Sequence, residues 1–160
     1  MTDLNVKVFE AFSNDWALLT AGNAAHFNTM TIGWGGFGTL WSKPVATVYV
    51  RPNRYTYEFM EENDYFTVSF FPETYKKDLA LLGRKSGRDG DKLALTDISA
   101  KELPNGIGFN EASLTVVCRK VYYQDLDGSC IPEDAKERYY KDEPVHRMYI
   151  GEVVDVIQHA

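Results

Sequence analysis

Short segments of β-type sequence recur along the whole chain and leave room only for short helices. His26 to Trp34 and Lys43 to Arg51 alternate larger apolar residues with small polar or β-branched ones, the pattern of a half-buried strand. Further strands are predicted at 16–21, 65–71, 112–123 and 147–157, and helices at 53–63, 75–82 and 132–140. This order differs from βαβ winding, so we predict a mainly β fold, an antiparallel barrel with peripheral helices.

The composition predicts one ordinary globular domain over residues 1–160, since we find no repeat, linker or low-complexity segment. A net charge of −6 argues against general binding of nucleic acids. Cys118 and Cys130 form no disulfide framework and have no second ligand at zinc spacing, so no metal is expected. With no signal-like or membrane-spanning segment in the sequence, we expect a cytoplasmic protein that has no membrane partner.

Gly33, Gly35 and Gly38 match the G-x-G-x-x-G pattern of dinucleotide-binding proteins letter for letter. That pattern requires a helix directly after the glycines, whereas Thr39 to Arg51 is β-branched, aromatic and interrupted by Pro44. We therefore predict a glycine-rich bend between strands, where a backbone or a flat ligand comes close.

Two cationic elements predict a phosphate site. Arg51 and Arg54 flank the start of the helix predicted at 53–63, with Asn53 as its N-cap, and Thr56 adds a hydroxyl. The second element, 84–92, holds four cations and two acids, and Ser86 and its glycines expose backbone N–H groups. Taken singly, each has a plain alternative: two solvated arginines, or a flexible charged turn.

A third element combines amide, hydroxyl and large aromatic groups over two predicted strands. It runs from Asn28 to Trp34 and continues from Thr39 to Ser42. Such groups suit the edge of a flat heterocycle that carries carbonyls and ring nitrogens. Simple core packing is the alternative for Trp34 and Trp41.

In this order, the three elements resemble the flavin reductase-like family, whose members bind FMN in a split β-barrel. The likeness lies in 28–31 with Trp34, in 44–51, in 54–56, in 86–89 with 91–92, and in His146 with the strand 149–153. The resemblance spans about residues 14 to 155. One departure is Leu82 before Gly83, where many relatives carry Cys, and it puts thiol chemistry at this loop in doubt.

The resemblance implies a six-stranded antiparallel Greek-key split β-barrel with short peripheral helices. It also implies a homodimer with FMN near the subunit interface. The residues implied along the flavin ring and ribityl chain are Asn28, Met30, Thr31 and Trp34, with Thr39, Trp41 and Ser42 nearby; those implied at the phosphate are Arg51, Arg54, Thr56, Ser86, Gly87 and Lys92. His146 is a candidate for substrate binding, although a structural or interface role is the favoured interpretation.

The implied activity is that of an NAD(P)H-dependent oxidoreductase, which reduces flavin or a metal complex by hydride transfer through flavin N5. No catalytic residue is named, because the cofactor carries the chemistry. The alternative is a flavoredoxin-like carrier that exchanges electrons with a protein partner and does not turn over NADH or NADPH itself. Since the cationic elements suit a terminal phosphate, we expect FMN in preference to FAD.

Overall fold

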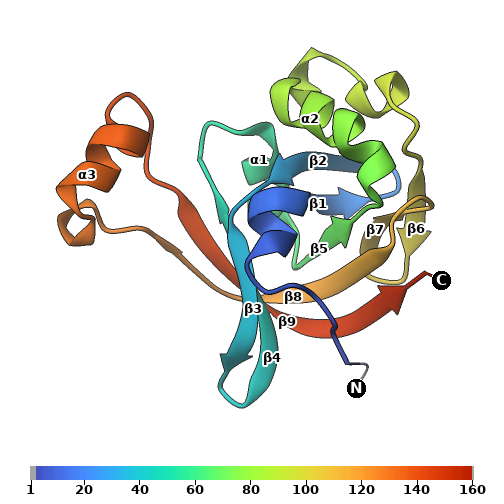
Figure 1. Cartoon of the computed structure of the whole chain (residues 1–160), viewed down its shortest axis with the longest axis horizontal. Helices are drawn as coiled ribbons and strands as arrows, with labels where there is room; N and C mark the ends of the chain where they lie inside the picture. The colour runs from blue at the N-terminus through green and yellow to red at the C-terminus, as the bar shows by residue number, and fades with distance from the viewer. Residues whose placement is uncertain (1–2, 160) are drawn as a thin grey trace.

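A curved antiparallel sheet with short helices around it forms the body of the chain in the computed structural model, which describes residues 3–159 (Figure 1). The spatial order of its seven strands is β2, β1, β5, β8, β9, β4, β3. Their bounds are β1 Ala17–Asn23, β2 His26–Ile32, β3 Gly35–Leu40, β4 Lys43–Val50, β5 Tyr65–Phe70, β8 Leu114–Asp125 and β9 Arg147–Gln158. A separate two-stranded sheet pairs β6 Ala100–Leu103 with β7 Gly106–Phe109.

The mainly β class with short peripheral helices is confirmed, but the expected count of six strands is wrong. The additional strands are β3, β6 and β7. The glycine-rich stretch predicted as a bend is largely strand β3, which pairs with β4 along its whole length, from Gly35 opposite Val48 to Leu40 opposite Lys43. A strand in place of a helix after the glycines agrees with the exclusion of a dinucleotide-binding motif.

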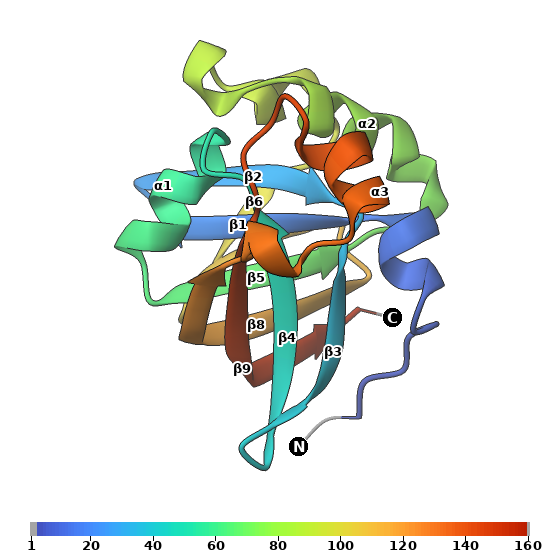
Figure 2. The same cartoon turned by 90° about the vertical axis from the view of Figure 1, so that its left-hand side faces the viewer.

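Strand β1 lies between two hydrophobic clusters, because its side chains alternate between the faces of the sheet. Ala17, Leu19 and Ala21 belong to the larger cluster, which also contains Phe59 of a helix. Leu18 points to the smaller cluster, together with Leu79 and Leu82 among others. The sheet therefore carries apolar packing on both faces. Helix α1 Tyr55–Glu62 lies beside β1 and β2, and helix α2 Lys76–Arg84 lies beside β2 (Figure 2).

The helices are α1 Tyr55–Glu62, α2 Lys76–Arg84 and the short α3 Glu133–Ala135, and single turns lie at Ala11–Asp15, Glu73–Tyr75, Gly87–Asp89, Lys92–Leu95, Gly128–Cys130 and Lys136–Tyr140. The prediction of Asn53 as the N-cap of α1 is wrong. Arg54 occupies that position, without a side-chain cap, and Asn53 instead donates a hydrogen bond to Glu143. None of the helices in the described part of the chain is long and apolar enough to cross a membrane.

Strands β8 and β9 extend beyond the rest of the sheet and carry the excursion 126–146, which contains α3 (Figure 1). Arg147 fastens the base of this excursion, with its guanidinium 2.7 Å from Asp125 and 2.9 Å from Glu61 of α1. The buried Tyr149 donates a further hydrogen bond to Glu61, at 2.6 Å. The excursion and α1 are therefore tied to one another at the base of β9.

Candidate phosphate and flavin site

Edge strand β2, helix α1 and the segment that follows α2 enclose a pocket of about 220 Å³, which we call the phosphate pocket. Strand β2 ends the sheet order, so within the described sheet one side of its backbone is unpaired. The pocket is lined by Asn28, Met30, Asn53, Arg54, Tyr55, Thr56, Gly83, Arg84, Lys85, Ser86, Gly87, Arg88 and Lys92.

The wall of the phosphate pocket is fixed by one buried hydrogen bond. Asn28 Nδ2 donates to Thr56 Oγ1 at 2.8 Å, which joins β2 to the first turn of α1. Gly87 packs directly against this pair, because a Cβ atom added at Gly87 would lie 2.1 Å from Asn28 Oδ1. Any larger residue at this position would displace Asn28, so glycine is required for the close approach.

Lys92 is the most deeply placed cation of the phosphate pocket, with 6% of its surface exposed. Its Nζ donates to the carbonyls of Leu82, at 3.1 Å, and of Lys85, at 3.2 Å, at the C-terminal end of α2. These carbonyls form the negative end of the helix dipole, which explains how a lysine is held there. Burial, and then the neighbouring Arg54, lower the pKa of Lys92 to about 8.

Arg54 reaches the same helix end, where its Nη2 lies 3.4 Å from the Gly83 carbonyl. Burial, and then Arg51, lower the pKa of Arg54, and Glu143 offsets part of that effect. Within residues 3–159, neither Arg54 nor Lys92 forms a salt bridge. Two mutually repelling cations without a carboxylate partner favour the binding of an anion between them.

The loop opposite these cations is shaped by Ser86, whose hydroxyl accepts a hydrogen bond from the Arg88 N–H at 3.2 Å. The Arg88 side chain turns outward over the ring of Tyr55 and lies 3.5 Å from Glu58. The Arg88 charge is therefore paired with that of Glu58. The loop contributes Lys85, Ser86, Gly87, Arg88 and Lys92 to the lining of the phosphate pocket.

Arg51, Trp34 and His146 meet in an aromatic cluster beside the phosphate pocket. Arg51 donates to the Pro144 carbonyl at 2.9 Å and lies over the ring of Tyr140. The rings of Trp34 and His146 are 5.1 Å apart, and His146 Nδ1 is 2.8 Å from the Tyr140 hydroxyl. Burial first, and then Arg51 and Arg54, lower the pKa of His146 to about 4, so the imidazole is neutral at neutral pH.

The remaining residues of the predicted site lie apart from the phosphate pocket. Thr31 donates to the Leu79 carbonyl at 2.5 Å and lines a neighbouring hollow with Gly83 and Trp16. Thr39 is near the end of β3, and Trp41 and Ser42 form the turn of the β3–β4 hairpin. Trp41 is 63% exposed. Within one chain, the structure therefore does not bring this hairpin to the pocket.

Seven of the predicted residues converge in the phosphate pocket: Asn28, Met30, Arg54, Thr56, Ser86, Gly87 and Lys92. The predicted site residues did not include six others that line the pocket: Asn53, Tyr55, Gly83, Arg84, Lys85 and Arg88. The signal was available, since five of these residues lie within the two cationic elements and Gly83 directly precedes the second one. Among the described residues, no group of His, Cys, Asp and Glu is arranged to hold a metal ion.

The sequence model of a family described as "Flavin reductase like domain" matches residues 9–160. Among solved structures, a flavoredoxin from Methanosarcina acetivorans has 24% identity and a TM-score of 0.71, over 99% of this chain and 75% of that chain. An FMN-binding protein from Thermus thermophilus has 17% identity and a TM-score of 0.70, over 99% of this chain and 80% of that chain. Nitrilotriacetate monooxygenase component B from Bacillus cereus has 18% identity and a TM-score of 0.67, over 88% of this chain and 67% of that chain. A search of curated proteins finds no match.

The charge state of Lys92 predicts how anion binding to the phosphate pocket depends on pH. Sulfate is a suitable probe because it does not change its charge in this range. The association constant for sulfate should be flat well below pH 8 and fall by up to about tenfold per pH unit above it, as Lys92 loses its proton. Calorimetric titration at several pH values measures this. Lys92→Met should bind sulfate more weakly and without this pH dependence; an unchanged profile in that variant would assign the titration to another group.

Proposed function

Because the chain belongs to the flavin reductase-like domain family, we propose that it is an FMN-binding oxidoreductase that reduces a flavin or a metal complex with NAD(P)H. The observation that carries this proposal is the pair of cations formed by the half-buried Arg54 and the buried Lys92, in a pocket whose lining has no carboxylate. Such a pocket suits the phosphate of a nucleotide.

The donor set fits the phosphate of FMN. Arg54 and Lys92 supply charge, Thr56 and Ser86 supply hydroxyl groups, and Gly87 leaves space where a side chain would collide with Asn28. We place the flavin ring toward Met30, Thr31 and Trp34, along the unpaired edge of β2. There, backbone N–H and C=O groups can pair with the polar edge of a heterocycle.

The chemistry supplied by a bound FMN is hydride acceptance at N5 and release of electrons one or two at a time. This chain's residues contribute binding and orientation. Arg54 and Lys92 anchor one end of the cofactor, while the aromatic cluster of Trp34 and His146 closes the other side of the site. The neutral His146 adds no charge beside Arg51, and we assign it a positioning role through its contact with Trp34.

Anaerobic mixing of the FMN-loaded protein with NADH and, separately, NADPH tests the proposed activity. Loss of the flavin absorption band on the time scale of turnover with either nucleotide is the expected result. A flavin that is bleached by dithionite but by neither nucleotide would contradict the reductase proposal. That outcome would favour the alternative, a flavoredoxin-like carrier that receives its electrons from a protein partner.

Arg54→Ala should weaken FMN binding by roughly 1.5 to 3 kcal/mol, the usual size of a lost charge-assisted hydrogen bond. Fluorescence titration of flavin-free protein measures the change, and circular dichroism checks the fold. Arg119→Ala is the matched control, since Arg119 pairs with Glu152 on the sheet and lines no part of the phosphate pocket. Unchanged FMN affinity in a folded Arg54→Ala protein would show that the phosphate binds elsewhere.

We further propose that the chain forms a homodimer that completes the site. Large apolar side chains are exposed on the sheet and hairpin, among them Trp41 at 63% and Tyr123 at 54%. Since Thr39, Trp41 and Ser42 lie away from the pocket of their own chain, contact with the flavin would place them in a partner's site. Light scattering at micromolar concentration should give the mass of a dimer, and a monomer with full FMN occupancy would contradict the proposal.

A further inference from the structure

A second hollow adjoins the phosphate pocket beside helix α2, and we call it the Trp16 hollow. Its volume is about 400 Å³, within the range of roughly 300 to 1,000 Å³ that is usual for small-molecule sites. Strand β2 supplies Thr31, Gly33 follows that strand, and α2 supplies most of the remaining wall. Gly83 and Arg84 line both this hollow and the phosphate pocket. The two sites are therefore neighbours at the C-terminal end of α2.

The indole of Trp16 is held in the wall of this hollow by a strained backbone. Its φ of 65° and ψ of 165° lie in a region that is essentially confined to glycine. The hydrophobic cluster that contains Leu79 and Leu82 packs against the indole and keeps it in place. Strained residues of this kind gather at active sites and ligand clamps. The strain is therefore an indication, independent of the size of the hollow, that a ligand binds there.

Two cations stand at the Trp16 hollow without a carboxylate partner. Lys76 Nζ lies 3.9 Å from the centre of the Trp16 ring, and Arg84 belongs to the lining. Within residues 3–159, neither side chain forms a salt bridge, and no carboxylate lines the hollow. The indole holds the Lys76 ammonium in position by a cation–π contact and leaves its charge unpaired. Both cations are therefore available to an anionic ligand.

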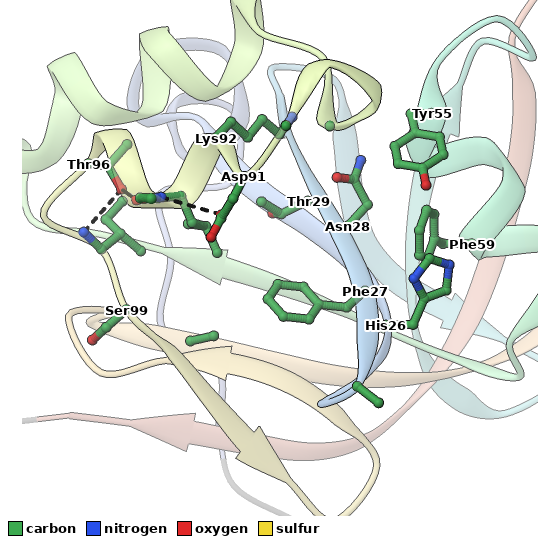
Figure 3. Close-up of a pocket in the computed structure, with 17 residues that line it drawn as sticks. His26, Phe27, Asn28, Thr29, Tyr55, Phe59, Asp91, Lys92, Thr96 and Ser99 are labelled. Atoms are coloured by element: carbon green, nitrogen blue, oxygen red, sulfur yellow. Dashed lines mark hydrogen bonds between the residues drawn. The ribbon is translucent and has the colours of Figure 1, made fainter.

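A larger cavity, of about 590 Å³, lies at the start of β2 and is less suited to a second anion (Figure 3). Asn28, Tyr55 and Gly87 pack on one another and separate it from the phosphate pocket. Its lining contains the carboxylate of Asp91, and the Lys92 amine in that lining already donates to two carbonyls. The Trp16 hollow, with unpaired cations and no carboxylate, is the better match for an anionic group.

We propose that the Trp16 hollow binds the adenosine end of NADPH, with Lys76 and Arg84 paired with its 2′-phosphate. The proposal rests on the proposed function, because the hollow is lined by Thr31, toward which we place the flavin ring. The apolar wall formed by Trp16 and Leu79 suits an adenine ring. Since NADH lacks the 2′-phosphate, the two unpaired cations select NADPH as the electron donor.

Two adenosine phosphates that differ only in the 2′-phosphate, 2′,5′-ADP and 5′-AMP, test the site without catalysis. Both are titrated by calorimetry into FMN-loaded protein, in which the phosphate pocket is already filled. The wild-type protein should bind 2′,5′-ADP about tenfold or more tightly than 5′-AMP, and in Lys76→Met this preference should fall to about threefold or less. Lys77→Met is the matched control and should keep the preference, because Lys77 is exposed and lines neither the hollow nor the phosphate pocket.

Steady-state reduction of the bound flavin provides a second measurement. The wild-type kcat/KM should be about tenfold or more higher with NADPH than with NADH, and this ratio should fall in Lys76→Met but not in Lys77→Met. A ratio near one in the wild-type protein would overturn the selection of NADPH while leaving the proposed reductase activity intact.

Equal affinities of the wild-type protein for the two adenosine phosphates would overturn the proposal and leave the proposed function intact. A preference for 2′,5′-ADP that survives Lys76→Met, or release of FMN by 2′,5′-ADP, would also overturn it, because the nucleotide would then bind elsewhere. A preference that Lys76→Met removes, in a protein whose flavin neither NADPH nor NADH reduces, would support the site in the hollow and contradict the proposed function.

Discussion

The account of this site depends on one constraint: the buried Lys92 and the half-buried Arg54 lie against the same helix end, and no carboxylate lines their pocket. Lys92 is held by the carbonyls of Leu82 and Lys85, and Arg54 approaches that of Gly83. The helix dipole and the backbone acceptors offset part of the desolvation cost. The pKa values of both side chains are nevertheless lowered, by burial first and then by a neighbouring arginine. A bound phosphate dianion would offset the burial of these charges and their mutual repulsion.

The rest of the fold places these cations beside an open strand edge. Helix α2 is fastened by Leu79 and Leu82 in the smaller hydrophobic cluster, so its C-terminal end has a fixed position. Helix α1 is joined to β2 by the hydrogen bond between Asn28 and Thr56. Gly87, in the segment after α2, allows that segment to pack closely against this pair. Strand β2 then runs past the phosphate pocket toward the aromatic cluster. A nucleotide lying along it would meet different chemistry at each point.

Much of this arrangement was predictable from sequence, and what was missed has physical causes. Arg54 to Thr56 and Ser86 to Lys92 were recognisable because cations, hydroxyls and glycines cluster locally. Strand β3 was missed since pairing with β4, rather than intrinsic propensity, holds Gly35 to Leu40 extended. The tight turn at Trp41 and Ser42, with φ of 52° and 59°, has neither glycine nor asparagine to reveal it. The phosphate pocket joins residues of 28–30, 53–56 and 83–92, and no local pattern encodes how these segments meet.

The contribution of the phosphate group to flavin binding tests the central claim most directly. Calorimetric titration of flavin-free protein with FMN and with riboflavin isolates that contribution, because the two ligands differ only in the phosphate. If Arg54 and Lys92 hold the phosphate, riboflavin should bind weaker than FMN by about 3 kcal/mol or more, the size of two charge-assisted hydrogen bonds. Equal affinities for FMN and riboflavin would contradict the account, since Arg54 and Lys92 would then have no part in recognising the cofactor.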